Sequence, residues 1–235
     1  MAVRAHIVCL VLAALTMVWA EAASSDDLPA DMASHVLACA PCHGANGGGT
    51  NDPYFPRLAG KPAGYLNNQL RAFKSGRRHY PPMNYLLEYL PEDYLATIAA
   101  YFAAQRPPLP QAAVPDVSQA MMARGEALVR HGDSAHGIPA CSSCHGPTLT
   151  GMEPAIPGLL GLRAIYISAQ LGAWRYGTRT AIAPDCMQIV AGHLTEDDVK
   201  SVAAWLSSRP APADPVPVAA GSYVLPFTCG SEPQQ

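Results

Sequence analysis

A short motif of two cysteines and a histidine occurs twice in this chain. The first copy reads Cys39-Ala40-Pro41-Cys42-His43, and the second reads Cys141-Ser142-Ser143-Cys144-His145. Two cysteines separated by two residues and followed at once by a histidine are the attachment signature of c-type haem. The thiols can form thioethers with the vinyl groups of the porphyrin, and the histidine is then placed beneath the iron as an axial ligand. The sequence therefore predicts two covalently bound haem c groups, attached through Cys39, Cys42, Cys141 and Cys144 and ligated by His43 and His145.

Three other kinds of site also use closely spaced cysteines. A thioredoxin-like redox pair lies in a βαβ unit, and no such pattern surrounds either motif. A zinc site needs four ligands, drawn from within one half of the chain or from both motifs together. A structural disulfide remains open for a protein of an oxidising compartment. Two copies of the motif in matched settings favour haem over all three.

The similarity between the two halves of the chain extends well beyond the motif. A run of matched residues follows each copy: Tyr65, Gln69, Leu70, Phe73, Gly76 and Arg78 correspond to Tyr166, Gln170, Leu171, Trp174, Gly177 and Arg179. The match continues further on, where Glu92-Asp93 corresponds to Glu196-Asp197 and Tyr101 to Trp205. A similarity that persists from end to end indicates a duplicated domain.

The repeat also selects candidates for the second axial ligand of each iron. Met83 and Met187 occupy the same slot of the two copies, in a predicted loop before the last helix. Methionine opposite histidine raises the reduction potential of a haem and suits it to electron transfer. Met121, Met122 and Met152 have no counterparts in the first copy, so they are interpreted as core residues. The rival ligands His79 and His193 have no histidine counterparts either.

Other repeated residues are candidates for the walls of the two pockets. Tyr65 and Tyr166, with Phe73 and Trp174, are large enough to cover a haem, and Arg78 and Arg179 could bind its propionates. The alternative interpretation, with the aromatic residues in an ordinary core and the arginines in solvent, stays open at this point.

The chain is predicted to be all-α, because helical patterns recur and no alternating run is long enough for a confident strand. Gly76 and Gly177 stand where helices should end. Thr195 with Asp198 resembles a capping box, and Pro91 suits a first helical turn. The predicted helices cover residues 65–74, about 91–104, 118 to about 131, 166–175 and 195 to about 207.

Composition and an N-terminal apolar run indicate the cellular compartment and the expected division into domains. The residues are 49% hydrophobic and 14% charged, and the net charge of -3 gives no reason to expect nucleic acid as a partner. A cleavable signal peptide is predicted by Arg4, the apolar run Ile7 to Trp19 and Ala20-Glu21-Ala22, since a membrane span needs about 20 apolar residues. An uncleaved N-terminal anchor is the alternative interpretation. We therefore expect a periplasmic protein with no membrane span after cleavage. The expected division is a signal peptide 1–22, a domain 28–106, a proline-rich linker 107–117, a second domain 118–208 and a proline-rich tail 209–235.

Two cysteines are not explained by the duplication. Cys186 and Cys229 belong to the mature chain, while Cys9 lies in the predicted signal peptide. Two such cysteines in an oxidising compartment suggest a disulfide, which would tie the tail to the segment that carries Met187. Connectivity cannot be deduced from sequence alone, so the pairing is a hypothesis.

Over residues 30 to 208 the sequence resembles the di-haem class I cytochromes c of the c-four type. The resemblance rests on Arg124-Gly125, Gly132-Asp133, the run from Pro139 to Pro147, Leu58-Ala59-Gly60 and Met83. It implies two tandem class I cytochrome c domains, each a few helices around a covalently bound haem with histidine and methionine as ligands. It also implies periplasmic electron transfer to redox partners such as a terminal oxidase or a dehydrogenase. The Cys186 and Cys229 pair, the tail and the longer loop from Tyr176 to Asp185 depart from that pattern.

Three hypotheses for function follow. The first is a freely diffusing electron carrier of a respiratory chain, which needs saturated ligation at both irons. The second is the cytochrome subunit of a periplasmic dehydrogenase, such as a flavocytochrome. The third is a haem enzyme, a peroxidase or a thiosulfate-oxidising cytochrome, which needs a displaceable ligand and a nearby acid or base. The sequence contains no such catalytic constellation, so no catalytic residue is assigned and the carrier is the leading hypothesis.

Overall fold

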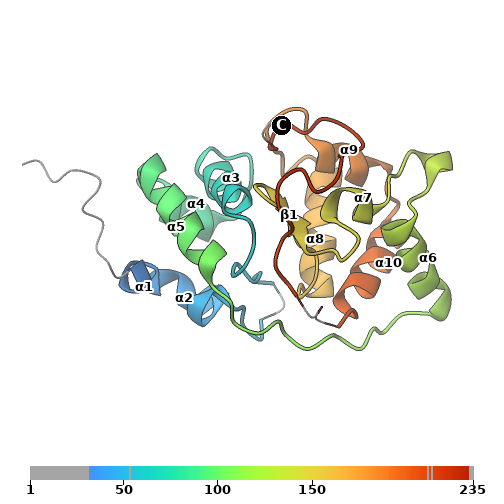
Figure 1. Ribbon diagram of the computed structural model, residues 1–235, viewed down its shortest axis with the longest axis horizontal. Coiled ribbons are helices and arrows are strands. Elements are labelled where there is room, and N and C mark those ends of the chain that lie inside the picture. The colour runs from blue at the N-terminus through green and yellow to red at the C-terminus, as the bar shows by residue number, and fades with distance from the viewer. Residues whose placement is uncertain (1–31, 53, 211, 213, 233–235) are drawn as a thin grey trace, which may run out of the picture. The chain divides into compact units, whose positions relative to one another are not determined.

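The computed structural model describes residues 32–52, 54–210, 212 and 214–232. The predicted signal peptide and Cys9 lie outside these residues. The described chain forms two successive groups of helices, named here the first domain (α1 to α5) and the second domain (α6 to α10) (Figure 1). The expected all-α class with two cytochrome-like domains is confirmed, whereas the residue limits 28–106, 107–117 and 118–208 stay a prediction.

The helices of the two domains follow the order that the repeat predicts. The first domain contains α1 (Met32–His35), α2 (Ala40–His43), α3 (Ala63–Lys74), α4 (Pro81–Leu87) and α5 (Glu92–Ala104), with short 3-10 turns at Leu37–Cys39 and Ala45–Gly47. The second contains α6 (Gln119–Arg130), α7 (Cys141–His145), α8 (Ala164–Arg175), α9 (Cys186–His193) and α10 (Glu196–Ser207), with a 3-10 turn at Ser134–His136. No helix within these described ranges has the length and apolar character that crossing a membrane requires.

Local sequence accounts for the start of several helices. Ser118 caps α6 by accepting a hydrogen bond from the backbone N–H of Met121, and Thr195 and Asp198 form the expected capping box at α10. The expectation for Pro91 was wrong by one position, because it is the extended residue before α5 and the helix begins at Glu92. Its missing N–H costs nothing there, since no helical bond is due at that position.

Each domain buries its own apolar core. In the first domain α3 packs against α5, and in the second α10 packs against both α6 and α8. The first core is centred on Val36, Leu66, Ile98, Ala99 and Phe102, and the second on Leu128, Val129, Ile138, Val202 and Trp205. Separate cores of this kind are what a duplicated domain requires, because each copy must bury its own apolar face.

A glycine allows α6 and α10 to pack closely in the second domain. Gly125 of α6 faces the carbonyl oxygen of Ser201, and a Cβ atom at Gly125 would stand only 2.2 Å from that oxygen. Arg124 ties the same helices together, because its Nε donates to Asp198 at 2.7 Å and its Nη1 to Asp133 at 2.9 Å. The absence of a side chain at Gly125 therefore sets the distance between α6 and α10.

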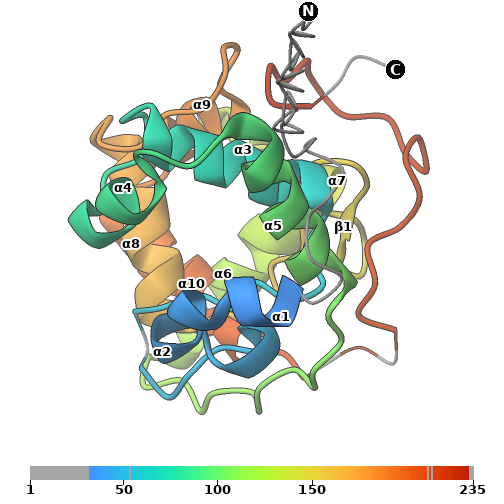
Figure 2. The same ribbon diagram turned by 90° about the vertical axis from the view of Figure 1, so that its left-hand side faces the viewer.

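The only strands in the described residues are two short ones. β1 (Gly151–Met152) pairs antiparallel with β2 (Ile156–Pro157), and Val218 of the tail forms a parallel bridge to Met152. Strands this short carry no alternating pattern, which is why the sequence does not predict them. Figure 2 shows the tail passing beside β1 along the outside of the second domain. The tail is therefore a packed part of the second domain.

Replacing Gly125 by alanine should destabilise the protein by about 1–3 kcal/mol, because the added methyl group overpacks the contact of α6 with α10. Guanidinium unfolding of the holoprotein followed by circular dichroism measures the change.

Gly172 on α8 is the matched control, since a Cβ there meets no atom within 4 Å. Gly172→Ala should leave stability unchanged or raise it by up to about 1 kcal/mol through helix propensity. Equal unfolding midpoints for the two variants would contradict the close-packing interpretation.

Candidate functional site

The two Cys-x-x-Cys-His motifs form matched helical turns. Cys42 and His43 belong to α2, with Cys39 just before it, and the whole second motif forms α7. Each turn ends at a glycine with positive φ, Gly44 at 76° and Gly146 at 83°. A Cβ atom at Gly44 would stand 2.1 Å from the carbonyl oxygen of Gly49, so the chain can reverse here only with glycine. The reversal leaves each motif histidine at the end of its helix, turned into the protein interior.

Both motif histidines are buried and held by one ring nitrogen. The Nδ1 atom of His43 lies 2.9 Å from the carbonyl oxygen of Pro56, and that of His145 lies 2.7 Å from the carbonyl oxygen of Pro157. A carbonyl only accepts, so Nδ1 carries the proton and Nε2 keeps its lone pair. Burial lowers the pKa of both imidazoles, which keeps them neutral. A neutral imidazole with a fixed ring and a free Nε2 is suited to bind a metal.

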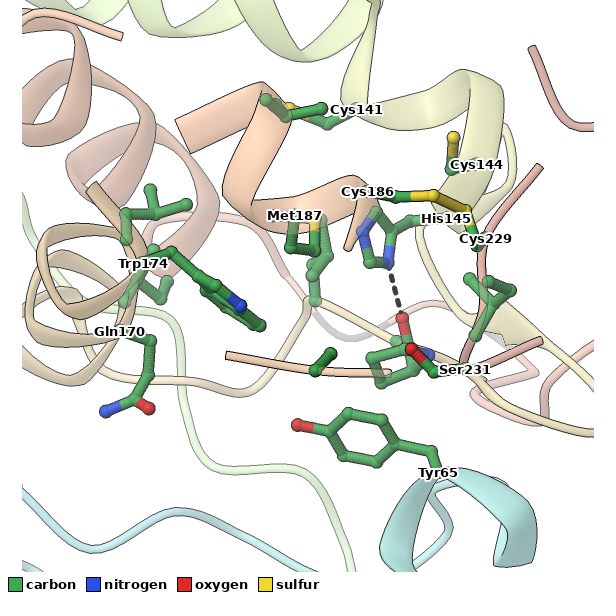
Figure 3. A pocket seen from close by; sticks show the side chains of 18 of the residues that line it. Tyr65, Cys141, Cys144, His145, Gln170, Trp174, Cys186, Met187, Cys229 and Ser231 are labelled. Atoms are coloured by element: carbon green, nitrogen blue, oxygen red, sulfur yellow. Dashed lines mark hydrogen bonds between the residues drawn. A yellow bond between two sulfur atoms is a disulfide. The ribbon is translucent and has the colours of Figure 1, made fainter. Parts of the chain in front are cut away.

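Each motif opens into a pocket that also contains the repeat-matched methionine. Cys39, Cys42, His43 and Met83 line the first pocket. Cys141, Cys144, His145 and Met187 line the second, as Figure 3 shows. The structure thus brings together in each domain all four residues that the sequence singles out.

The prediction that the two methionines lie in loops was wrong. Met83 lies in α4 and Met187 in α9, both short helices. Pro81 and Pro82 start α4, where their missing N–H groups cost nothing, and Asp185 caps α9 by accepting from the backbone N–H of Gln188. A helical turn fixes the methionine backbone more firmly than a loop does.

The chemistry of the thiols does not match the competing interpretations. Burial raises the pKa of Cys141 to about 12 and also raises the pKa of Cys39 and Cys144. Thioredoxin-like cysteines need the opposite shift. Within the described residues, no group of three or more histidine, cysteine, aspartate or glutamate side chains could hold a metal ion, so the zinc interpretation lacks a ligand set.

A network of arginines and glutamines lies between the two pockets. Gln69 Oε1 accepts from Arg78 and Arg179, and Gln170 Oε1 accepts from the same two arginines, at 2.8 Å from Arg78 and 2.7 Å from Arg179. Tyr166 accepts a further bond from Arg78 at 2.9 Å. Each glutamine thus joins the arginine of its own domain to that of the other, and the repeat-matched residues form the contact between the domains.

The arginines stack on the repeat-matched aromatic residues of their own domains. The Cζ atom of Arg179 lies 3.6 Å from the ring centre of Trp174, and that of Arg78 lies 4.5 Å from the ring centre of Phe73. The exposed fractions of Arg78 and Arg179 are 8% and 3%, so the alternative of solvated arginines was wrong. These side chains belong to the pocket walls.

The polar groups of the pockets fit a cofactor that carries carboxylates. Among the described residues, neither Arg78 nor Arg179 forms an ion pair with an acidic side chain. The Nε1 atom of Trp174 is buried without a hydrogen-bond partner in the same part of the chain, and Trp174 points into the second pocket (Figure 3). Buried cations and donors without partners are costly, so each pocket is built to receive anions beside an apolar ring. Haem, with two propionates on an apolar macrocycle, meets that description.

The sequence interpretation missed three features of these pockets. Pro56 and Pro157, which hold the histidines, recur after the motif in both copies, so the repeat contained a signal for them. Lys61 lines both pockets but has no counterpart in the second copy. The hydroxyl of Tyr223 in the tail donates to the carbonyl oxygen of Cys144 at 3.0 Å, a long-range contact that no local pattern reveals.

A disulfide attaches the tail to the second pocket. Cys186 and Cys229 are bonded, with their Cα atoms 5.4 Å apart, and both residues line the pocket next to Met187 (Figure 3). Beyond the disulfide, the backbone carbonyl of Ser231 accepts from Asn68 Nδ2 of α3 in the first domain at 2.9 Å. The tail therefore closes one edge of the second pocket and reaches the other domain.

Comparisons with known proteins agree with this construction. The cytochrome c family profile matches residues 33–101. The chain is 38% identical to a thiosulfate dehydrogenase electron acceptor of Thiomonas intermedia, over 82% of this chain and 86% of that protein. It is also 38% identical to cytochrome c4 of Pseudomonas aeruginosa, over 73% of this chain and 83% of that one.

Two solved structures are similar to this fold. The reduced recombinant cytochrome c4 of Pseudomonas stutzeri matches with a TM-score of 0.65 and 33% identity, over 74% of this chain and 95% of that chain. The thiosulfate dehydrogenase TsdBA of Marichromatium purpuratum matches with a TM-score of 0.67 and 38% identity, over 77% of this chain. This chain spans only 38% of the TsdBA chain.

Replacing Cys186 and Cys229 together by alanine should lower the free energy of unfolding by about 2–4 kcal/mol, because the disulfide no longer restricts the unfolded chain. Thr228→Ala, beside Cys229 on an exposed position, retains the disulfide and serves as the control. Denaturant unfolding measures both variants. An unchanged midpoint in the double variant would show that the disulfide contributes nothing to stability.

Proposed function

We propose that this chain, which belongs to the cytochrome c4 family of c-type cytochromes, carries two haem c groups and transfers electrons between redox proteins of the periplasm. The observation that supports two haems best is the duplication of the complete pocket. Each domain provides a Cys-x-x-Cys-His turn, a neutral histidine held through Nδ1 and a methionine in the same pocket.

The residues that would hold each haem are those that the repeat pairs. Cys39 and Cys42 would form the thioethers of the first haem, with His43 and Met83 as axial ligands. In the second domain the corresponding residues are Cys141, Cys144, His145 and Met187. Bound in this way, haem iron supplies a reversible one-electron couple, and the methionine sulfur raises its potential.

The other residues of the pockets support electron transfer in three ways. The carbonyl groups of Pro56 and Pro157 fix the two imidazole rings, so the ligands need not move when the charge changes. Apolar side chains exclude water from the pocket walls, and Arg78 and Arg179 offer charge-assisted bonds to the propionates at the contact between the domains. If a histidine and a methionine both bind each iron, no coordination position would be left for a substrate, as expected for an electron carrier.

The relatives are electron carriers by name, which favours this function over a haem enzyme. Two of them, from Thiomonas intermedia and Stutzerimonas stutzeri, are named electron acceptors of thiosulfate dehydrogenase. We therefore propose a dehydrogenase of this type as a candidate electron donor for this chain. A terminal oxidase remains a candidate acceptor.

Replacing Met83 or Met187 by histidine should lower the reduction potential of the haem in the same domain. The reason is that a bis-histidine haem has a lower potential than a histidine–methionine haem. Intact-mass measurement should first show two haems on the unmodified protein. A spectroelectrochemical titration should then show two one-electron steps, with a different step lowered in each variant. Met121→Leu, on a methionine without a repeat counterpart, should change neither step.

Carbon monoxide provides an independent check of the same ligands. The reduced unmodified protein should not bind it, whereas Met187→Ala should bind it at one haem because that iron then lacks its sixth ligand. A mass that corresponds to one haem would contradict the proposal of two haems. Carbon monoxide binding to the unmodified protein would contradict the proposal that histidine and methionine both bind each iron.

The oxidised protein should be reduced when it is mixed with thiosulfate and purified thiosulfate dehydrogenase, because relatives serve that enzyme as acceptors. Stopped-flow absorbance of the haem bands measures the rate. Omitting the dehydrogenase gives the background, and coelution in gel filtration separates a bound subunit from a diffusing carrier. A rate equal to the background would remove this donor while leaving the electron-carrier function in place.

A further inference from the structure

Lys61 of the first domain lies against the loop of the second domain that holds His145. It precedes α3, and its Nζ atom donates to the carbonyl oxygen of Gly158 at 3.1 Å. Gly158 directly follows Pro157, whose carbonyl oxygen holds His145. The carbonyl that binds the ammonium group is therefore next in the chain to the carbonyl that binds His145. Its charge contributes to the lowered pKa of His145, after the larger effect of burial.

The residue that follows the histidine-holding proline differs between the two copies. Arg57 directly follows Pro56, which holds His43, and its side chain is 7% exposed. Gly158 is the matching position of the second copy. A Cβ atom at Gly158 would stand 2.7 Å from the carbonyl oxygen of Thr150, so no arginine can occupy that position without a backbone shift. The second copy therefore has no basic residue after Pro157, and Lys61 reaches this loop from the neighbouring domain.

Lys61 has no acidic partner that would cancel its charge. Within the residues that the structure describes, its ammonium forms no ion pair, and its one hydrogen-bond acceptor is the Gly158 carbonyl. Its environment lowers its pKa to about 8, chiefly through burial. The group is therefore cationic at neutral pH, and its field in a partly buried place is weakly screened by salt.

We propose that Lys61 is a positioning residue that raises the reduction potential of the second haem from across the domain contact. This inference rests on the proposed two-haem function. A fixed positive charge near an iron favours the ferrous state, which carries one positive charge fewer than the ferric state. The second copy has Leu162 at the position that matches Lys61, so the charge of Lys61 has no repeat-matched counterpart for the first haem. The two haems are made unequal by a residue outside the second haem's own domain.

The test is Lys61→Gln, which removes the charge and keeps a hydrogen-bond donor. The holoprotein is titrated by spectroelectrochemistry at a pH below the pKa of Lys61. The reduction potential of the second haem should be lower in the variant than in the unmodified protein. We expect its one-electron equilibrium to shift about tenfold, about 59 mV. The potential of the first haem should move less, although Lys61 also lines the first pocket, because its ammonium is bonded to the loop of the second. The Met187→His variant identifies which step belongs to the second haem.

Two further variants separate charge from structure. Lys61→Arg keeps the cation and should restore most of the potential. Lys200→Gln removes an exposed lysine, 61% exposed, and should leave both steps unchanged. If Lys61→Gln does not fold with two haems, Lys61→Met replaces it as an apolar side chain of similar length.

The outcomes distinguish this inference from the proposed function. A single reduction step in the unmodified protein would overturn the two-haem proposal itself. If the two reduction potentials shift no more in Lys61→Gln than in Lys200→Gln, the role of Lys61 is overturned and the two-haem proposal stands. A larger shift of the first haem's step than of the second would also overturn it.

Discussion

Two guanidinium groups of like charge are buried together at the contact between the domains, and this constraint organises the surrounding structure. Arg78 and Arg179 share the side-chain oxygens of Gln69 and Gln170, and no described acidic side chain neutralises them. Neutral acceptors orient such groups but leave their charge uncompensated. The carboxylates of the proposed haems would supply the missing negative charge at this contact.

The sequence could predict which residues share each pocket with the motif, because the haem-attachment signature is a fixed local pattern. The repeat then selected Met83 and Met187, and the structure places each of them in the same pocket as its motif. Their secondary structure was harder to predict. The helix that contains Met187 follows a long loop and is capped by Asp185. The helix that contains Met83 follows a shorter loop and begins with two prolines instead.

Residues whose role depends on the other domain or on the tail were not predictable in this way. A comparison of the two copies detects what they share, so it does not detect Lys61, which is matched by Leu162. Tyr223 contacts Cys144 from far along the chain, and nothing in the tail's proline-rich composition specifies that contact. Long-range tertiary contacts of single residues leave no periodic signal.

The C-terminal segment gives the two domains a second connection. The first is the linker, whose Pro107 and Pro108 carbonyl groups accept from Arg57. The second runs from the disulfide at Cys229 to Ser231, which is bonded to Asn68 of the first domain. Together with the arginine–glutamine network, these connections limit how far one domain can pivot against the other. If both haems are bound as proposed, electrons crossing between the pockets would therefore meet a narrow range of distances, and the time course of internal transfer should be close to a single exponential.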